Sequence, residues 1–191
     1  SVSEEGIIDI NQSLDVTFSE KRHGIYLDIP THYNMEWEID EQTVKRGYRF
    51  PVSNIKVFDH EYDVESYSKG KRIRIGSGDS YVNGEVEYDV SYRIKTTDLD
   101  LNGKQMLYYN LIAPAWNTTI RAASFIIHMP KAFDKNSVNF YFGEYGSDLK
   151  QMPGFTYEVV GSTIYANLSA PLNPMEGITI QVDVPNGYFH Y

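Results

Sequence analysis

The chain has 191 residues, a formal net charge of −9 from 17 basic and 26 acidic side chains, and no cysteine. The lack of cysteine excludes disulfides, thiolate nucleophiles and cysteine zinc sites. The excess of acidic side chains argues against binding to nucleic acid and against adsorption to anionic lipid, because both partners need a basic protein surface. Hydrophobic residues make up 41% of the chain, which is enough to build a core, so we expect a folded protein.

The chain shows no internal repeat, low-complexity run or linker-like segment. All-β domains often reach this length as one unit. We therefore expect residues 1–191 to form a single domain. No apolar run approaches the roughly 18 residues that cross a bilayer, so we expect no membrane-spanning segment within them.

Apolar and polar residues alternate with a period of two in several stretches, which predicts strands with one face in a core. These stretches are 8–18, 35–39, 86–94 and 178–184. The most regular is 86–94, where we expect the apolar parity to point inward and the charged parity to face water. Its apolar residues are Val86, Tyr88, Val90, Tyr92 and Ile94, and the charged residues between them include Glu87, Asp89 and Arg93.

Turn residues separate the predicted strands. Asn83-Gly84 predicts a hairpin turn before the strand 86–94, because both residues tolerate positive φ. Gly161-Ser162 predicts a second hairpin, which joins 155–160 to 163–168.

The remaining stretches complete the fold prediction. The stretch 120–129 is apolar on both parities and predicts a central strand buried on both faces. Only 110–116 and 134–137 suit a helical turn. Together the elements predict an all-β fold with minimal helix, an antiparallel two-sheet β-sandwich that is immunoglobulin-like or related.

One loop resembles the start of a calcium-binding loop. Asp98, Asp100 and Asn102 place oxygen side chains at every second position, and Gly103 follows them. An EF-hand loop also needs a bidentate carboxylate at its twelfth position, which here is Tyr109. A polar hairpin loop is the stronger interpretation, so these three residues are a weak calcium candidate and we expect no tightly bound metal.

Other candidate sites have simpler explanations. The histidines lack metal-binding spacing; they are His23, His32, His60, His128 and His190. The stretch 76–80 reads Gly-Ser-Gly-Asp-Ser, which is neither a nucleophile elbow nor a phosphate-binding loop, so we interpret it as a turn. We expect no cofactor and no catalytic residues.

Aromatic residues and carboxylates leave two alternatives open. The chain has 16 tyrosines and 2 tryptophans, which could form an exposed platform for a carbohydrate, although core packing is the stronger explanation for most of them. A pair of carboxylates could flank a glycosidic bond, but spacing across a fold is not visible in a sequence.

Several motifs resemble those of one family. The stretch 23–30 reads His-Gly-Ile-Tyr-Leu-Asp-Ile-Pro, 73–76 reads Ile-Arg-Ile-Gly, and 107–110 reads Leu-Tyr-Tyr-Asn before Trp116. These resemble the H-G-I-Y-R-x-I-P, I-R-I-G and L-Y-W-N…W motifs of the YciQ-like predicted membrane proteins of bacteria, whose N-terminal domain is the domain of unknown function DUF2207. Leu27 stands where the family tends to have Arg, and Tyr109 stands where it has Trp. The motif residues carried by the resemblance are His23, Gly24, Ile25, Tyr26, Pro30, Tyr109 and Trp116.

The resemblance implies a domain outside the cytoplasmic membrane, preceded by a signal sequence and followed by transmembrane helices. The family has no established reaction or ligand, so no catalytic residue is transferred from it. We expect a non-catalytic extracytoplasmic module, anchored to the membrane by segments outside these residues, that binds an unknown ligand or protein. One alternative is a carbohydrate or cell-wall binding domain, with or without the assistance of calcium. The other alternative is a hydrolase of surface polymers.

The C-terminal residues suggest two interpretations. Tyr188 and Phe189 follow the predicted last strand, and amphipathic rings are common near a membrane interface. We expect a membrane-spanning helix to follow within a short linker. The alternative is that both rings pack on the end of the domain.

Overall fold

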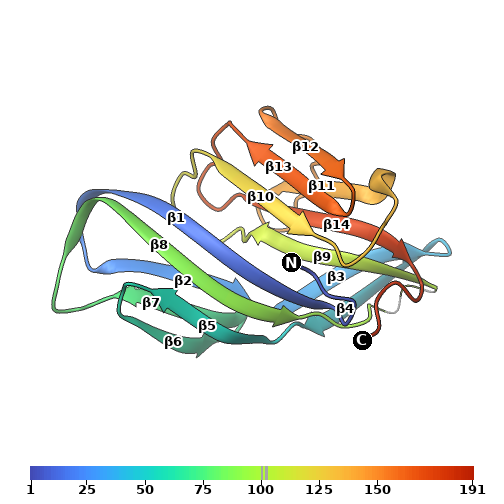
Figure 1. Cartoon of the computed structure of the whole chain (residues 1–191), viewed down its shortest axis with the longest axis horizontal. Coiled ribbons are helices and arrows are strands. Elements are labelled where there is room, and N and C mark those ends of the chain that lie inside the picture. Colours follow the sequence, from blue (N-terminus) through green and yellow to red (C-terminus); the bar gives the residue numbers. More distant parts are fainter. Residues whose placement is uncertain (100, 102) are drawn as a thin grey trace. The chain divides into compact units, whose positions relative to one another are not determined.

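The computed structural model describes residues 1–99, 101 and 103–191 of the chain (Figure 1). The chain divides into two compact units. Ile7–Thr97 form the inserted unit, and Ser1–Gly6 together with Asp98–Tyr191 form the terminal unit. Both ends of the described chain therefore belong to the same unit, and the other unit is an insertion between them.

The inserted unit contains two three-stranded antiparallel sheets and a hairpin. The sheet orders are β1-β8-β5 and β2-β7-β6, and β3 pairs with β4. The strands are β1 (Ile7–Arg22), β2 (Gly24–Pro30), β3 (His32–Ile39), β4 (Gln42–Arg49), β5 (Val52–Phe58), β6 (Tyr62–Tyr67), β7 (Gly70–Gly76) and β8 (Val82–Lys95).

The terminal unit also contains two three-stranded antiparallel sheets, with the orders β10-β13-β12 and β11-β14-β9. A short 3-10 helix, η1 (Lys135–Ser137), precedes β11. The strands are β9 (Lys104–Ile112), β10 (Ala123–His128), β11 (Val138–Gly143), β12 (Phe155–Val160), β13 (Thr163–Leu168) and β14 (Gly177–Pro185).

The strand β8 has the register that its alternation predicts. Tyr88, Val90 and Ile94 are at most 2% exposed, and Tyr92 is buried as well. On the opposite parity Glu87 is exposed, and Arg93 donates to Asp9 of β1 at 2.7 Å and 2.9 Å. The inward assignment is therefore confirmed for the apolar residues of 88–94, whereas Val86 and Asp89 are half-buried.

The last strand, β14, forms the centre of the terminal unit's core. Ile178, Ile180 and Val182 are fully buried, as their alternation predicts. Aromatic rings connect the two sheets of this unit, because Phe140 and Phe142 of β11 contact Phe155 of β12 with centroids 4.7 Å and 4.8 Å apart.

The prediction of an all-β, antiparallel fold with almost no helix is confirmed. The arrangement within each unit is consistent with a sandwich. The expectation of a single domain stays a prediction. Within the described residues, no helix combines the length and the apolar character needed to cross a membrane.

Asn83-Gly84 does not form the predicted hairpin turn, because both residues lie inside β8. Gly84 has a φ of +66° and lies opposite Phe18, and the register shifts between Phe18 and Arg22 of β1. The positive φ of Gly84 therefore belongs to a bulge in the β1–β8 ladder. A bulge bends the strand, whereas a hairpin turn would reverse the direction of the chain. The hairpin at Gly161-Ser162 is confirmed, since β12 and β13 flank it at the predicted residues.

The apolar stretch 120–129 is not a central strand buried on both faces, and that prediction is wrong. Its strand, β10, lies at the edge of its sheet. Ile127 is buried, whereas Ile126 is 60% exposed. Ile126 lies opposite Tyr165 of the central strand β13, which is 41% exposed, so this face of the sheet points to solvent, which periodicity does not report.

Candidate functional site

The motifs of the inserted unit lie side by side. β2 begins at Gly24 and pairs residue by residue with β7, which ends at Gly76. Gly24 lies opposite Gly76, and Tyr26 lies opposite Arg74. The H-G-I-Y and I-R-I-G stretches are therefore two strands of one ladder.

The glycines at the end of this ladder allow a close backbone approach. A Cβ on Gly24 would lie 1.8 Å from the carbonyl oxygen of Ile75, and one on Gly76 would lie 2.0 Å from that of His23. Both have positive φ, +150° and +128°, which side chains disfavour. The glycines of the two motifs are thus required by packing.

Alternation sorts the side chains of β2 and β7 onto two faces. Leu27, Ile29, Ile73 and Ile75 are at most 3% exposed and form the inner face. The outer face belongs to polar and aromatic side chains of β2, β7 and β6. We name it the Tyr26–Arg72 face, and its residues are Tyr26, Asp28, Asp63, Glu65, Tyr67, Arg72 and Arg74.

Arg72 is the centre of the Tyr26–Arg72 face. Its Nε and Nη2 donate to the two carboxylate oxygens of Asp28 at 2.7 Å and 3.0 Å. Its guanidinium carbon lies 5.2 Å from the ring centroid of Tyr26 and 5.6 Å from that of Tyr67. The hydrogen bonds to Asp28 raise the pKa of Arg72 above its usual range, and burial raises the pKa of Tyr67. Arg72 therefore connects Asp28, Tyr26 and Tyr67 in one cluster.

A second ion pair extends the same face. Arg74 donates to Asp63 at 2.8 Å, in the row that also contains Tyr26. Tyr26 is 57% exposed. The face therefore places a solvent-facing aromatic ring beside hydrogen-bonded charged groups.

The family model described as "Predicted membrane protein (DUF2207) N-terminal domain" matches residues 1–184. The chain belongs to this family. The resemblance seen in the motifs is confirmed at the level of the DUF2207 domain. No curated protein and no solved structure matches the chain.

The motif residues of this DUF2207 domain are divided between the two units. His23 stacks on Tyr81 with centroids 4.3 Å apart, and its Nδ1 lies 2.8 Å from the carbonyl oxygen of Ser80. Tyr109 and Trp116 belong to the terminal unit. Both are half-buried there, and Tyr109 lies opposite Ile180 on β14.

The calcium candidate is only partly described. Asp98 is exposed, and Asp100 and Asn102 lie outside the described residues. Among the residues that are described, no group of three potential ligands could hold a metal ion.

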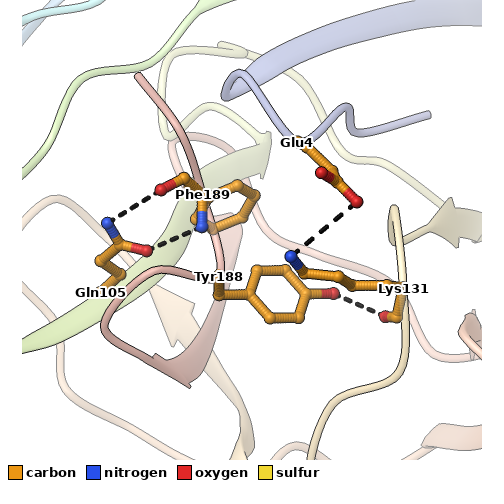
Figure 2. A network of polar contacts seen from close by, with 5 residues as sticks. All are labelled: Glu4, Gln105, Lys131, Tyr188 and Phe189. Atoms are coloured by element: carbon orange, nitrogen blue, oxygen red, sulfur yellow. Dashed lines mark hydrogen bonds and ion pairs between the residues drawn. The ribbon is translucent and has the colours of Figure 1, made fainter.

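Tyr188 and Phe189 are buried within the terminal unit (Figure 2). The Tyr188 hydroxyl donates to the carbonyl of Lys131 at 2.6 Å, and the side chain of Gln105 donates to and accepts from the backbone of Phe189. Glu4 forms an ion pair with Lys131 at 3.8 Å. Both rings are less than 5% exposed, so the alternative interpretation, that they pack on the end of the domain, is confirmed.

Sequence reasoning missed Asp28, Arg72 and Tyr67 as members of one cluster. A local signal existed, because Tyr26 and Asp28 alternate with apolar residues, as Arg72 and Arg74 do. The sequence did not reveal that the two strands pair, because Asp28 and Arg72 are 44 residues apart and such a pairing leaves no local pattern.

Proposed function

We propose that this chain is the non-catalytic, extracytoplasmic interaction module of a membrane protein, and that it binds its partner through the Tyr26–Arg72 face. The observation that carries the proposal is the exposed ring of Tyr26 beside the fixed Asp28–Arg72 pair. Exposed aromatic and arginine side chains are typical of recognition surfaces. Membrane association comes from the family.

The charged groups support a binding role over a catalytic one. A carboxylic acid that donates a proton at neutral pH needs a raised pKa. In Asp9 the hydrogen bonds from Arg93 lower the pKa. On the Tyr26–Arg72 face, Asp28 and Asp63 accept hydrogen bonds from arginines and form ion pairs with them.

The side of the membrane can be tested with single cysteines, because the chain has no cysteine of its own. Tyr145 is 78% exposed and Val182 is fully buried. In an otherwise cysteine-free full-length protein, we expect a membrane-impermeant maleimide to label Tyr145→Cys in intact cells. Val182→Cys is the matched control and should react only after unfolding. Labelling of Tyr145→Cys that begins only on lysis would place the domain in the cytoplasm and contradict the proposal.

A second candidate function is carbohydrate binding, favoured by the 57% exposure of Tyr26. A sugar ring can stack on an exposed tyrosine while neighbouring charged groups bond its hydroxyls. In a sedimentation assay with insoluble peptidoglycan, we expect Tyr26→Ala to weaken binding roughly tenfold, or about 1.4 kcal/mol. Tyr81→Ala, which removes a 65% exposed tyrosine outside this face, should bind as the unaltered chain does. Equal binding by all three proteins would remove this candidate.

A further inference from the structure

The strand β12 forms one edge of the sheet β10-β13-β12. β13 pairs with it on one side, from Phe155 opposite Leu168 to Val160 opposite Thr163. Across the part of the chain that the structure describes, no second strand pairs with β12. An unpaired edge presents backbone donors and acceptors at strand spacing, which another extended chain can pair with.

The hairpin turn determines which backbone groups of β12 point to the open edge. The two-residue loop 161–162 places a hydrogen-bonded pair beside it, here Val160 and Thr163. Hydrogen-bonded pairs alternate with open pairs along an antiparallel ladder. The N–H and C=O groups of Tyr157 and Val159 therefore point away from β13.

An aromatic cluster beneath the same edge is incompletely covered. The rings of Phe155 and Tyr157 lie 4.7 Å and 5.0 Å from that of Phe140 on β11, between centroids. Tyr157 is 46% exposed, whereas its partner Ala166 on β13 is 5% exposed. The difference arises because a core-facing side chain at an edge has a strand neighbour on one side only. A strand added beside β12 would cover Tyr157.

β12 lacks the devices that usually block an edge. Natural edges carry lysine, proline or a bulge, or another segment covers them. In the other sheet of this unit, the edge strand β11 is covered at Phe142, whose N–H donates to the carbonyl of Leu149 at 2.9 Å. β12 reads Phe-Thr-Tyr-Glu-Val-Val, in which Glu158 is the only charged residue and most residues favour strands.

We propose that the open edge of β12 binds an extended, basic segment of another polypeptide, which adds a strand to the sheet β10-β13-β12. Backbone bonds at Tyr157 and Val159 hold the added strand, and its alternate side chains give specificity. Glu158 is exposed on the outer face, where a cross-strand Lys or Arg is favoured. The net charge of −9 opposes pairing with a second copy and favours a basic partner. This surface is separate from the Tyr26–Arg72 face and does not depend on its function.

Two proline substitutions separate the open side of β12 from its paired side. Val159→Pro removes an N–H that points to the open edge, so we expect the melting temperature to stay within a few degrees of the unaltered chain. Glu158→Pro removes an N–H that bonds β13, so it should melt clearly lower. This pair also tests the assignment of the backbone groups.

The binding probe is a phage-displayed library of random dodecapeptides, selected on the whole chain and counter-selected on Val159→Pro. We expect the selected peptides to alternate β-branched or aromatic residues with Lys or Arg. Their affinity should fall at least tenfold on Val159→Pro, and amide exchange at Tyr157 and Val159 should slow at least tenfold when they bind. A Glu158→Lys variant, which keeps the strand, should select against basic peptides.

Three results would overturn the proposal. The first is no enrichment over the counter-selection. The second is equal binding of the selected peptides to Val159→Pro. The third is a concentration-dependent dimer, seen by sedimentation without peptide and lost in Val159→Pro, which would make a second copy of the chain the occupant of the edge.

Discussion

Val90→Asp is expected to lower the free energy of unfolding by about 4 kcal/mol or more. Val90 is 2% exposed on β8, between Gln12 of β1 and Val57 of β5. A carboxylate there would be surrounded by the core without a cationic partner on its own face, and such burial costs about 4 kcal/mol or more. Domains of this size have a total stability of about 5–15 kcal/mol, so the loss is a large fraction of it.

The measurement is urea unfolding followed by circular dichroism. Ser91→Asp is the matched control, because it introduces the same carboxylate one residue away, on the outward parity and opposite Lys56. We expect this control to change the free energy of unfolding by less than about 0.5 kcal/mol. A loss below about 1 kcal/mol for Val90→Asp would mean that the register of β8 is wrong.

The second large effect is expected for Gly24→Ala. The new Cβ would lie 1.8 Å from the carbonyl oxygen of Ile75, and the backbone φ of +150° is unfavourable for alanine. Relief of the contact requires β2 and β7 to separate at this end, which breaks backbone hydrogen bonds. We expect a loss of about 3 kcal/mol or more in the free energy of unfolding. Gly76→Ala should behave in the same way, since its Cβ would lie 2.0 Å from the carbonyl oxygen of His23.

Gly78→Ala is the control for this series. It lies in the loop after β7, and a Cβ there would have no atom within 4 Å. We expect it to be neutral or slightly stabilising, because alanine restricts the unfolded chain more than glycine does. If Gly24→Ala and Gly78→Ala unfold at the same urea concentration, the glycines of the two motifs do not act through this backbone contact.

Local patterns were sufficient where the controlling interaction is itself local. Period two along β8 and β14 identifies the buried parity, because successive side chains of a strand point to opposite faces. The hairpin at Gly161-Ser162 was predictable for the same reason, since a two-residue turn depends on residues within it. The all-β class follows from the sum of these signals.

Interactions between distant segments decided the rest. Asn83-Gly84 has the residues of a turn, yet pairing with β1 continues through it and makes a bulge. Ile126 has the residue type of a core position, yet it lies on the solvent-facing side of its sheet, opposite the exposed Tyr165. Tyrosine is common near membrane interfaces, yet the hydroxyl of Tyr188 donates a hydrogen bond to the carbonyl of Lys131, which is 57 residues away in the chain.

The candidate surfaces show the same division. The alternation of Tyr26 and Asp28 with apolar neighbours already places both on an outer face, but the ion pair with Arg72 exists only because β2 pairs with β7. The open edge of β12 likewise depends on the order of strands in its sheet. Side-chain parity is a property of one strand, whereas sheet order is a property of several segments that meet only in the folded chain. For this reason the solvent-facing parity of a regularly alternating strand could be predicted, and the neighbours of its residues could not.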